Sequence, residues 1–511
     1  MSFEEYVDLA LQVGKTALLL YCLGSSTVFL LALQVRKALI SRQKLKSIPT
    51  VGSSSIIGSW IDAFKFIFHA KEIVKEGQRM YGSIFKVPML DRWAVVVSGA
   101  EKINDIRKSS LEELAPFAQI PEDMDYAFGR SNRVDPYHAV VIRDALTRNI
   151  GPCFAEVQDE IEAAFRDNIP MTEDWVEVPA YDTILQIVCR ASNRMFVGLP
   201  LCESPLRRNP EYIKLNINYT THAFAFAHMI NMLLYPIFAP RRRAIAKAEK
   251  FLGDTIRERM HQQDVYGKDW PGKPNNLVSW LLDATYGNDN RRSVQDHCDK
   301  VLLVNLGAIH NTSMIFTTSL YALATHSEYA DILRDEVESI IYEEGCTKSA
   351  MGKMNKLDSF VKEAQRLYGN PGVFGMPRKS CKDFVFSDGT VVPAGVHINV
   401  AALSTHTDED NYEEPLEFKP WRFSEKGTQE GKGIHQYYMA TLSLDFVFFG
   451  NGRPACPGRF FAVNEVKALM SYVLLNFDVK LDKFPTSVWI AETQLPNQSS
   501  KVLFRKRVCT P

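Results

Sequence analysis

The hydrophobic and polar positions along this chain of 511 residues predict a protein built mostly from helices. From residue 53 onward most segments carry apolar residues at helical spacing. Patterns typical of β-strands are limited to short pieces at residues 83–87, 93–97, 384–386 and 397–400. The pattern therefore predicts a mainly α fold of the α+β class, with small β-sheets.

The first part of the chain has a different pattern. Residues 16–35 are mostly apolar and carry no formal charge, which is about the length that crosses a hydrocarbon core of ~30 Å. No basic stretch precedes this segment and no small-residue cleavage site follows it, as a cleaved signal peptide would require. We therefore expect residues 1–35 to hold one retained transmembrane helix, with a buried core helix as the alternative.

Basic residues follow this segment directly, at Arg36, Lys37, Arg42, Lys44 and Lys46. By the positive-inside rule, they place the rest of the chain on the cytosolic side of the membrane. Pro49 and Gly52 indicate a turn. We expect residues 36–52 to form a basic, proline-containing hinge and residues 53–511 to form a single large domain.

A second long apolar segment lies in the middle of the chain. Residues 301–327 contain no Asp, Glu, Lys or Arg, and Ser293 with Asp296 matches a capping box ahead of them. This pattern predicts a long buried helix. A second membrane span is the alternative, but the segment is too polar for lipid because it contains Asn305, His310, Asn311, Thr312, Ser313, Thr317 and Thr318.

Composition and charge narrow the function classes. The formal net charge is −1, so no long-range attraction to nucleic acid is implied. The nine cysteines are scattered along the chain without a CxxC pair. This distribution is typical of a reducing compartment and indicates neither a disulfide framework nor a zinc site.

One cysteine has unusual surroundings. Cys456 lies in a loop rich in glycine and proline, residues 449–458, and a helical pattern follows at residues 459–475. We expect backbone amides of the loop and the positive end of the helix dipole to lower the pKa of the thiol. A thiolate held in this way is either a nucleophile or a metal ligand, and Phe449 suits a flat partner lying against the loop.

The loop resembles the heme-binding signature of the cytochrome P450 family, Phe-x-x-Gly-x-Arg-x-Cys-x-Gly. The arginine slot is the one departure, because it holds Pro454 and the arginine is displaced by one residue. The resemblance implies heme b with an axial cysteine thiolate as metal ligand; a buried loop cysteine without a ligand is the alternative. It places cofactor contacts at Phe449, Arg453, Cys456 and Gly458.

The same resemblance implies further residues around the heme and the substrate. Arg143 matches the arginine of the family's Trp-x-x-x-Arg element, although Ala139 stands in the tryptophan slot and a solvated surface arginine is the alternative. Arg378 is the second expected partner of a heme propionate. The residues expected to line the substrate cavity are Ile309, Val373, Phe374 and Ile490.

Three residues are expected to support the cysteine loop. Glu363 and Arg366 are three apart on a predicted helix, a spacing that more often marks a surface ion pair. Residues 418–423 resemble the family's second arginine segment, which contributes Arg422. By resemblance, Glu363, Arg366 and Arg422 form a buried triad that takes no part in the chemistry.

The middle of the long helix, residues 307–313, resembles the family's oxygen-activation segment, Ala/Gly-Gly-x-Asp/Glu-Thr-Thr. His310 stands in the acidic slot and Asn311 in the first threonine slot, leaving Thr312 as the nearest hydroxyl. The resemblance implies that these three catalytic candidates relay protons during oxygen activation. The alternative is that they only satisfy hydrogen bonds within a buried helix.

The resemblance covers about residues 36–507 and implies a monooxygenase that oxidises a hydrophobic small molecule with O2. Electrons would come from NADPH through a separate NADPH-cytochrome P450 reductase, docked at basic residues such as Arg459 and Lys467. Similarity to fungal members suggests a terpenoid or other secondary metabolite as substrate. The expected location is the endoplasmic reticulum membrane, with the catalytic domain in the cytosol.

Two other functions stay open at this stage. Asn311 in the threonine slot favours a heme-thiolate isomerase, dehydratase or peroxygenase that does not use the usual activation of O2. A heme sensor or carrier without turnover is the third hypothesis, because a fold alone does not fix a reaction. By resemblance, residues 219–240 are expected to cover a hydrophobic substrate channel and to touch the membrane surface, with core packing as the alternative. Residues 114–134 are a second candidate for covering the channel, as an irregular loop.

Overall fold

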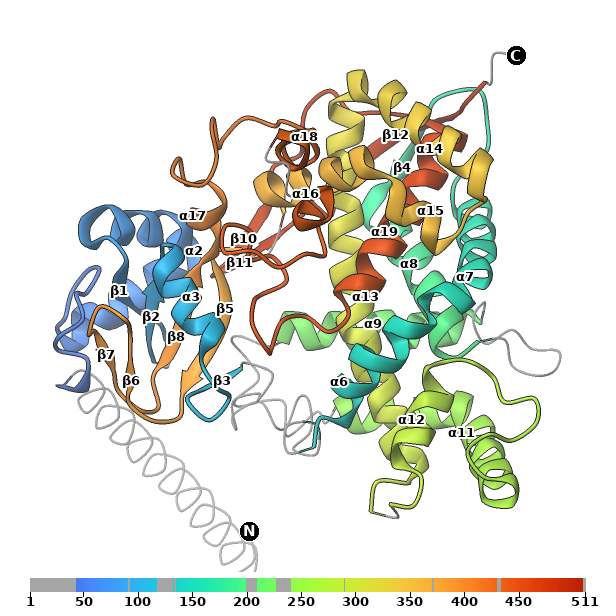
Figure 1. The fold of residues 1–511 in the computed structure, drawn as a ribbon, viewed down its shortest axis with the longest axis horizontal. Helices are drawn as coiled ribbons and strands as arrows, with labels where there is room; N and C mark the ends of the chain where they lie inside the picture. Colours follow the sequence, from blue (N-terminus) through green and yellow to red (C-terminus); the bar gives the residue numbers. More distant parts are fainter. Residues whose placement is uncertain are drawn as a thin grey trace, which may run out of the picture. The chain divides into compact units, whose positions relative to one another are not determined.

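The computed structural model describes residues 43–90, 92–116, 132, 135–198, 209–226, 240–288, 290–369, 372–429 and 433–508 (Figure 1). The expected transmembrane helix lies outside these residues, as do residues 36–42 of the hinge and residues 117–131 and 227–239 of the channel-covering segments. The chain forms two compact units, Met1–Ala115 with Pro377–Ala401 and Pro116–Met376 with Ala402–Pro511. The proposed boundaries of anchor, hinge and domain stay a prediction.

The first unit is built on a five-stranded sheet of order β1-β2-β8-β5-β3. Its strands are β1 (Ile84–Pro88), β2 (Trp93–Val97), β3 (Leu114–Pro116), β5 (Phe374–Ser380) and β8 (His397–Ala401). β1 and β2 confirm the strands predicted at residues 83–87 and 93–97; they pair antiparallel, and β2 pairs in parallel with β8. Because β2 is buried along its whole length, its sequence is apolar without alternation.

Two helices and a hairpin complete this unit. They are α2 (Ile56–Tyr81), α3 (Ala100–Lys108) and the strands β6 (Phe384–Val385) and β7 (Val391–Val392). The Ser55 side chain caps α2 by accepting a hydrogen bond of 3.0 Å from the Gly58 N–H. One face of α2 is buried through Phe66, Ala70 and Val74.

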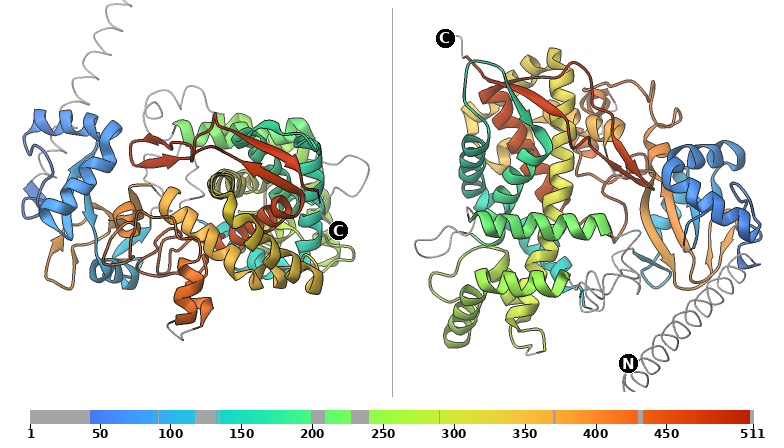
Figure 2. Two further views of the ribbon diagram at one scale, coloured as in Figure 1. Left: turned by 90° about the horizontal axis from the view of Figure 1, so that it is seen from above. Right: turned by 180° about the vertical axis from the view of Figure 1, so that it is seen from behind.

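The second unit is mostly helical (Figures 1 and 2). Its longer helices are α7 (Thr147–Asn168), α8 (Ala180–Phe196), α9 (Pro210–Phe226), α11 (Pro240–Tyr266), α12 (Leu277–Thr285), α13 (Val294–Thr325), α14 (Ala330–Glu344), α16 (Asn355–Tyr368), α18 (Arg422–Gln429) and α19 (Arg459–Asn476). Short elements include α6 (Tyr137–Val141), the π-helical turn η2 (Ile142–Leu146), α15 (Lys348–Lys353) and α17 (Ala402–His406).

Two small sheets belong to this second unit. One has the order β4-β12-β9, from β4 (Val176–Pro179), β9 (Phe477–Lys480) and β12 (Lys501–Lys506). The other pairs β10 (Val488–Ile490) with β11 (Thr493–Leu495). The helix-rich fold with small sheets agrees with the prediction from the hydrophobic pattern.

Helix α13 is the long central helix that the sequence predicted. Its 32 residues span about 48 Å, and the Ser293 side chain accepts the Asp296 N–H at 3.1 Å as the capping pattern predicts. Among the described residues, α13 alone is long and apolar enough to cross a membrane, and 78% of its most apolar window is buried inside the protein. We therefore assign it as a core helix.

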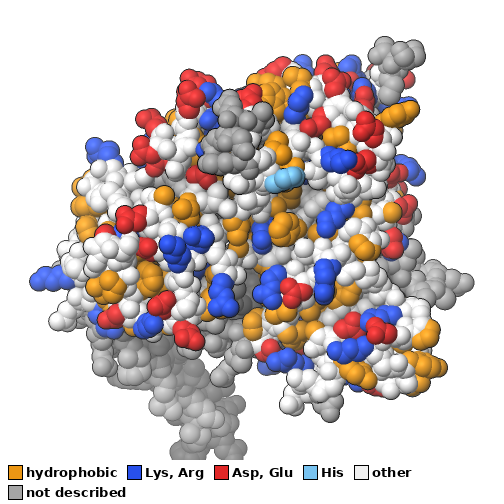
Figure 3. Space-filling model, viewed as in Figure 1, with side chains coloured by type: hydrophobic (Ala, Val, Ile, Leu, Met, Phe, Trp, Pro, Cys, Tyr) orange, Lys and Arg blue, Asp and Glu red, His pale blue; other side chains and the backbone are white. Residues whose placement is uncertain are grey.

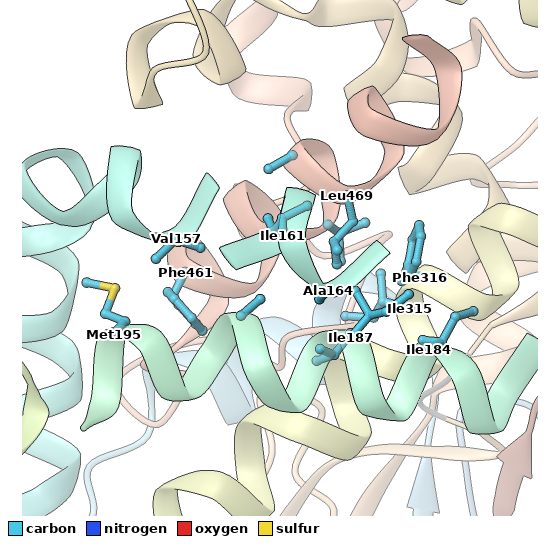
Figure 4. Close-up of a cluster of buried hydrophobic side chains, with 14 of the residues drawn as sticks. Val157, Ile161, Ala164, Ile184, Ile187, Met195, Ile315, Phe316, Phe461 and Leu469 are labelled. Atoms are coloured by element: carbon cyan, nitrogen blue, oxygen red, sulfur yellow. The ribbon is translucent and has the colours of Figure 1, made fainter. Parts of the chain in front are cut away.

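Side chains of several helices form the core around α13. Figure 4 shows side chains of α7, α8 and α19 meeting α13, among them Ile161, Ile187, Phe316 and Leu469. Each of these four side chains is almost completely buried. This packing fixes α19, which directly follows the cysteine loop in the chain, against α13.

The same interface buries one acidic side chain. Glu465 on α19 accepts hydrogen bonds from the Ser192 hydroxyl on α8 at 2.9 and 3.2 Å. Burial raises the pKa of Glu465 from 4.5 to about 8, although the hydroxyl partly counteracts this effect. Glu465 is therefore protonated in the folded protein at neutral pH.

Replacing Glu465 with glutamine is expected to flatten the pH dependence of stability. The folded protein keeps a proton that the unfolded chain releases, so stability is lost as the pH rises from 4.5 to about 8. Since each pKa unit is worth ~1.4 kcal/mol, we expect Glu465→Gln to gain a few kcal/mol over the wild type at pH 8 and little at pH 5. Urea unfolding measures both differences, and an equal difference at the two pH values would contradict the assignment.

Candidate active site

The loop before α19 is closed by its own backbone hydrogen bonds. Cys456 N–H donates to the Phe449 carbonyl at 2.8 Å, and Gly450 N–H donates to the Val447 carbonyl at 2.9 Å. Gly450 and Gly452 adopt φ angles of +70° and +73°, which glycine reaches without steric cost. The two glycines therefore allow the tight turn that places Cys456 at the start of α19.

The sulfur of Cys456 receives hydrogen bonds from the backbone N–H groups of Gly458 and Arg459. Burial nevertheless raises the pKa of the thiol above its ordinary value, and the two N–H groups with the Arg459 guanidinium offset only part of this effect. The prediction of a lowered pKa is therefore wrong for the thiol by itself, because desolvation outweighs the helix terminus. A bound metal ion would supply the missing stabilisation of the thiolate.

Glu363, Arg366 and Arg422 meet in the interior. The Arg366 guanidinium binds both carboxylate oxygens of Glu363, at 2.7 and 2.8 Å, and the side chains of this pair are 0% exposed. Arg422 Nε donates to Glu363 Oε1 at 3.1 Å. The three residues are therefore not a surface ion pair, and their role in supporting the cysteine loop stays a prediction.

His406, which sequence reasoning missed, lies between this triad and the cysteine loop. Its carbonyl accepts a hydrogen bond of 2.6 Å from Arg366 Nη1, and its ring Nε2 accepts one of 3.0 Å from Val447 N–H. Val447 in turn accepts the Gly450 N–H at the start of the loop. No motif quoted from the sequence marks His406, because its contacts are distant in sequence.

Helix α13 is buried through its middle except at one side. Gly307 and Asn311 are exposed and Ala308 is half-buried, and a Cβ added to Gly307 would meet nothing within 4 Å. Asn311 Nδ2 donates to the Gly307 carbonyl at 2.8 Å. These residues form an open face of α13 that carries a single polar side chain, the Asn311 amide.

The other two catalytic candidates do not share this face. His310 is buried, with its ring nitrogens 3.3 Å from the Tyr181 hydroxyl on α8 and 3.5 Å from the Thr221 hydroxyl on α9. Burial lowers the pKa of His310 to about 4, so its ring is neutral. Thr312 is also buried. The sequence predicted that the three residues act together, whereas on the helix only Asn311 lies on the open face.

A family model for cytochrome P450 matches residues 55–503 of this chain. The chain belongs to the cytochrome P450 family. It is 40% identical over 477 residues to cytochrome P450 monooxygenase 151 of Postia placenta, covering 91% of this chain and 94% of that protein. It is 30% identical over 479 residues to cytochrome P450 monooxygenase CYP512U6 of Ganoderma lucidum, covering 91% of this chain and 92% of that protein.

The fold is likewise that of a cytochrome P450. The solved structure of retinoic acid bound cyanobacterial CYP120A1 matches with a TM-score of 0.67 at 20% identity, covering 90% of this chain and 98% of that one. The chain is therefore a cytochrome P450 monooxygenase with the helix-rich fold of the family.

The family uses heme with a cysteine thiolate ligand, and two features of this P450 fit such a group. The Cys456 sulfur is held by backbone N–H groups at the start of α19. The open face of α13 has a glycine and an alanine, and these small residues would leave room for a flat macrocycle. The residues present would suit heme held by the thiolate of Cys456.

The arginines expected at the heme propionates differ in their surroundings. Arg378, in the first unit, is buried, and burial lowers its pKa to about 10. In the second unit Arg453 is exposed, and Arg143 is 62% exposed with an ion pair of 3.0 Å to Asp144. The three arginines therefore differ in burial, and their contacts with the propionates stay a prediction.

Two of the residues expected to line the substrate cavity lie on segments that the structure joins. Val373 N–H donates to the Glu492 carbonyl at 2.8 Å, which brings Val373 beside the turn that follows Ile490. Ile490 is exposed, and Phe374 is half-buried. Ile309 is different, because it is completely buried among Tyr181, Leu185 and other residues of α8 and α9. It therefore faces away from the open face of α13.

The two basic residues expected to dock a reductase are engaged inside the second unit. Lys467 is buried and pairs with Asp358 at 3.2 Å, so its assignment as a docking residue is wrong. Arg459 donates to the carbonyls of Ala440 and Cys456 at 3.1 and 2.9 Å. Figure 3 shows other Lys and Arg side chains on the surface of the second unit, in the area where Figure 1 places α6 and α19.

Proposed function

We propose that this P450 holds heme b through Cys456 and oxidises a hydrophobic small molecule with O2, using electrons from NADPH delivered by a separate reductase. The open face of α13 carries the proposal, because one amide among small and apolar residues suits a substrate with few polar groups. We propose a terpenoid or other fungal secondary metabolite as the substrate class. The similarity to fungal monooxygenases supports this choice.

Heme held by Cys456 would supply the redox centre for the activation of O2, with the thiolate as its electron-donating ligand. The chain provides the surroundings of that centre. One N–H of the Asn311 amide is engaged with the Gly307 carbonyl, which leaves the second N–H and the Oδ1 to orient a water molecule on the open face. O2 activation needs a proton, and an amide releases none at neutral pH. We therefore expect the oriented water, and not Asn311 itself, to donate this proton.

Replacing Asn311 with alanine is expected to uncouple NADPH consumption from product formation. Loss of the oriented water removes a proton donor, and general acid catalysis contributes on the order of 10²-fold or more. We expect product per NADPH to fall by about tenfold or more while hydrogen peroxide rises. Asn311→Thr, which restores a polar side chain, should recover much of the coupling.

The matched variant Thr312→Val tests whether Asn311 or Thr312 controls the coupling of NADPH consumption to product formation. Thr312 is buried beside Asn311, so we expect its substitution to change coupling less than that of Asn311. A larger loss in Thr312→Val than in Asn311→Ala would assign the proton transfer to Thr312.

The alternative is an isomerase, dehydratase or peroxygenase. It is favoured by the asparagine at position 311, where the family's oxygen-activation segment has a threonine. Host cells expressing the chain with a P450 reductase, compared with cells expressing the reductase and Cys456→Ser, will reveal the product. For a monooxygenase, the new metabolite carries one oxygen from labelled O2 and needs NADPH. A product formed without NADPH and O2 would establish the alternative.

Membrane attachment forms the second part of the proposal, and α2 supports it. The exposed side chains in the first half of α2 are mostly apolar, 37–78% exposed at Ile57, Trp60, Ile61, Phe64 and Phe68, with Lys65 as the charged exception. Beyond the kink at His69 the exposed residues are mostly charged, at Lys71, Glu72, Lys75, Glu76 and Arg79, and Met80 and Tyr81 are exposed only at the C-terminal end of the helix. Only seven residues separate the apolar segment 16–35 from Gln43, so they span ~28 Å at most and keep this unit near the membrane.

We expect the apolar half of α2 to contact lipid and the charged half to contact water. A fluorescent amino acid at position 64 should be quenched by nitroxide-labelled lipids severalfold more than the same group at position 75, in full-length protein in bilayers. Equal lipid quenching at the two positions would contradict the contact. Failure of the protein to remain in carbonate-washed membranes would contradict the anchor itself.

A further inference from the structure

His406 connects two parts of the second unit through different atoms. Its carbonyl is bound by Arg366 of the buried triad, and its ring Nε2 is bound by Val447 N–H. The residue ends the short helix α17 and is buried. One residue, through its backbone carbonyl on one side and its imidazole ring on the other, therefore joins the triad to the segment that leads into the cysteine loop.

The hydrogen bond to Val447 fixes the protonation state of the ring. A backbone N–H only donates, so Nε2 must be the acceptor and any ring proton must lie on Nδ1. Burial, followed by the positive charge of Arg366, lowers the pKa of His406 to about 3, which agrees with a neutral ring. The acceptor is therefore available throughout the neutral pH range.

Stacking holds the ring in place. The His406 imidazole lies parallel to Phe446, with ring centroids 5.0 Å apart, and Phe446 stacks on Phe448 at 5.8 Å. Phe448 meets Phe449 edge to face, and the Phe449 carbonyl accepts the Cys456 N–H. A continuous series of ring and backbone contacts thus leads from His406 to the cysteine.

We propose that His406 is a positioning residue that transmits the geometry of the Glu363, Arg366 and Arg422 triad to the cysteine loop by fixing Val447. The inference rests on the proposed heme ligation by Cys456. Without the acceptor at Nε2, the Val447 N–H is buried without a partner and the turn from Val447 to Gly450 loosens. The thiolate at Cys456 is then held less firmly.

Two variants separate the hydrogen bond from the packing. His406→Phe keeps a stacked ring but has no acceptor, whereas His406→Gln places an amide oxygen near the position of Nε2. In heme-loaded protein we expect His406→Phe to speed the conversion of the reduced carbonyl complex from the thiolate type to the thiol type on the order of tenfold. His406→Gln should restore most of the wild-type rate.

His297→Phe is the control for the loss of a buried histidine. His297 is buried on α13 and lies 3.1 Å from the Thr285 hydroxyl, away from the loop and the triad in its hydrogen bonds. We expect it to leave the conversion rate of the carbonyl complex unchanged, even if it destabilises the fold. Equal rates in His406→Phe and the wild type, or equal effects of phenylalanine and glutamine, would overturn the inference.

Hydrogen exchange tests the same contact without a variant. We expect the Val447 amide in heme-loaded wild type to exchange slowly, at the level of the core amides of α19, because it is buried and bound to His406. Rapid exchange of this amide would overturn the inference. A wild-type protein without a thiolate-type spectrum would instead contradict the ligation on which the inference rests.

Discussion

Replacing Glu363 with glutamine is expected to lower the free energy of unfolding by about 3–5 kcal/mol, which is a large fraction of the stability of a typical domain. The carboxylate is bound by Arg366 and Arg422 and accepts the Lys419 N–H at 3.1 Å. Its removal leaves two guanidinium groups in the interior without a counter-charge. Urea unfolding of the heme-loaded protein measures the change.

An exposed ion pair provides the control for this substitution. Glu177 and Lys501 are 2.9 Å apart on paired strands, and both side chains are more than half exposed. Glu177→Gln is therefore expected to cost less than ~1 kcal/mol. If Glu363→Gln were no more destabilised than Glu177→Gln, the triad would have no structural role.

Replacing Cys456 with serine is expected to reduce product formation on the order of 10³-fold or more, as for other groups that the chemistry requires. A serine hydroxyl is similar in size to the thiol, so the loop and α19 should still fold. It lacks the electron donation of a thiolate. Product formation with the reductase, normalised to bound heme, measures the effect.

Cys346→Ser is the matched control, because Cys346 is a half-buried free thiol elsewhere in the second unit. We expect its activity per heme to stay within about twofold of the wild type. Full activity in Cys456→Ser would show that Cys456 is not required for the reaction.

Sequence predicted those parts of the structure that local pattern determines. The charge-free stretch at residues 301–327 and the capping pattern at Ser293 predicted α13 and its cap, because burial and capping leave direct marks on the sequence. The resemblance also identified Glu363, Arg366 and Arg422, which the structure brings together. These features depend on residue type and spacing alone.

The directions of side chains could not be predicted in the same way. Successive residues on an α-helix point about 100° apart, so His310, Asn311 and Thr312 cannot all face one space. Lys467 looked like a surface cation, but its partner Asp358 is 109 residues away in sequence. The raised pKa of Cys456 likewise reflects burial, which depends on the complete fold.

The reduced carbonyl spectrum of the purified, heme-loaded protein tests the central claim most directly. If Cys456 is the axial ligand, the wild type gives the thiolate-type spectrum and Cys456→Ser does not. A spectrum of the imidazole-ligated type in the wild type, or a thiolate-type spectrum that survives in Cys456→Ser, would contradict the assignment of the heme to this loop.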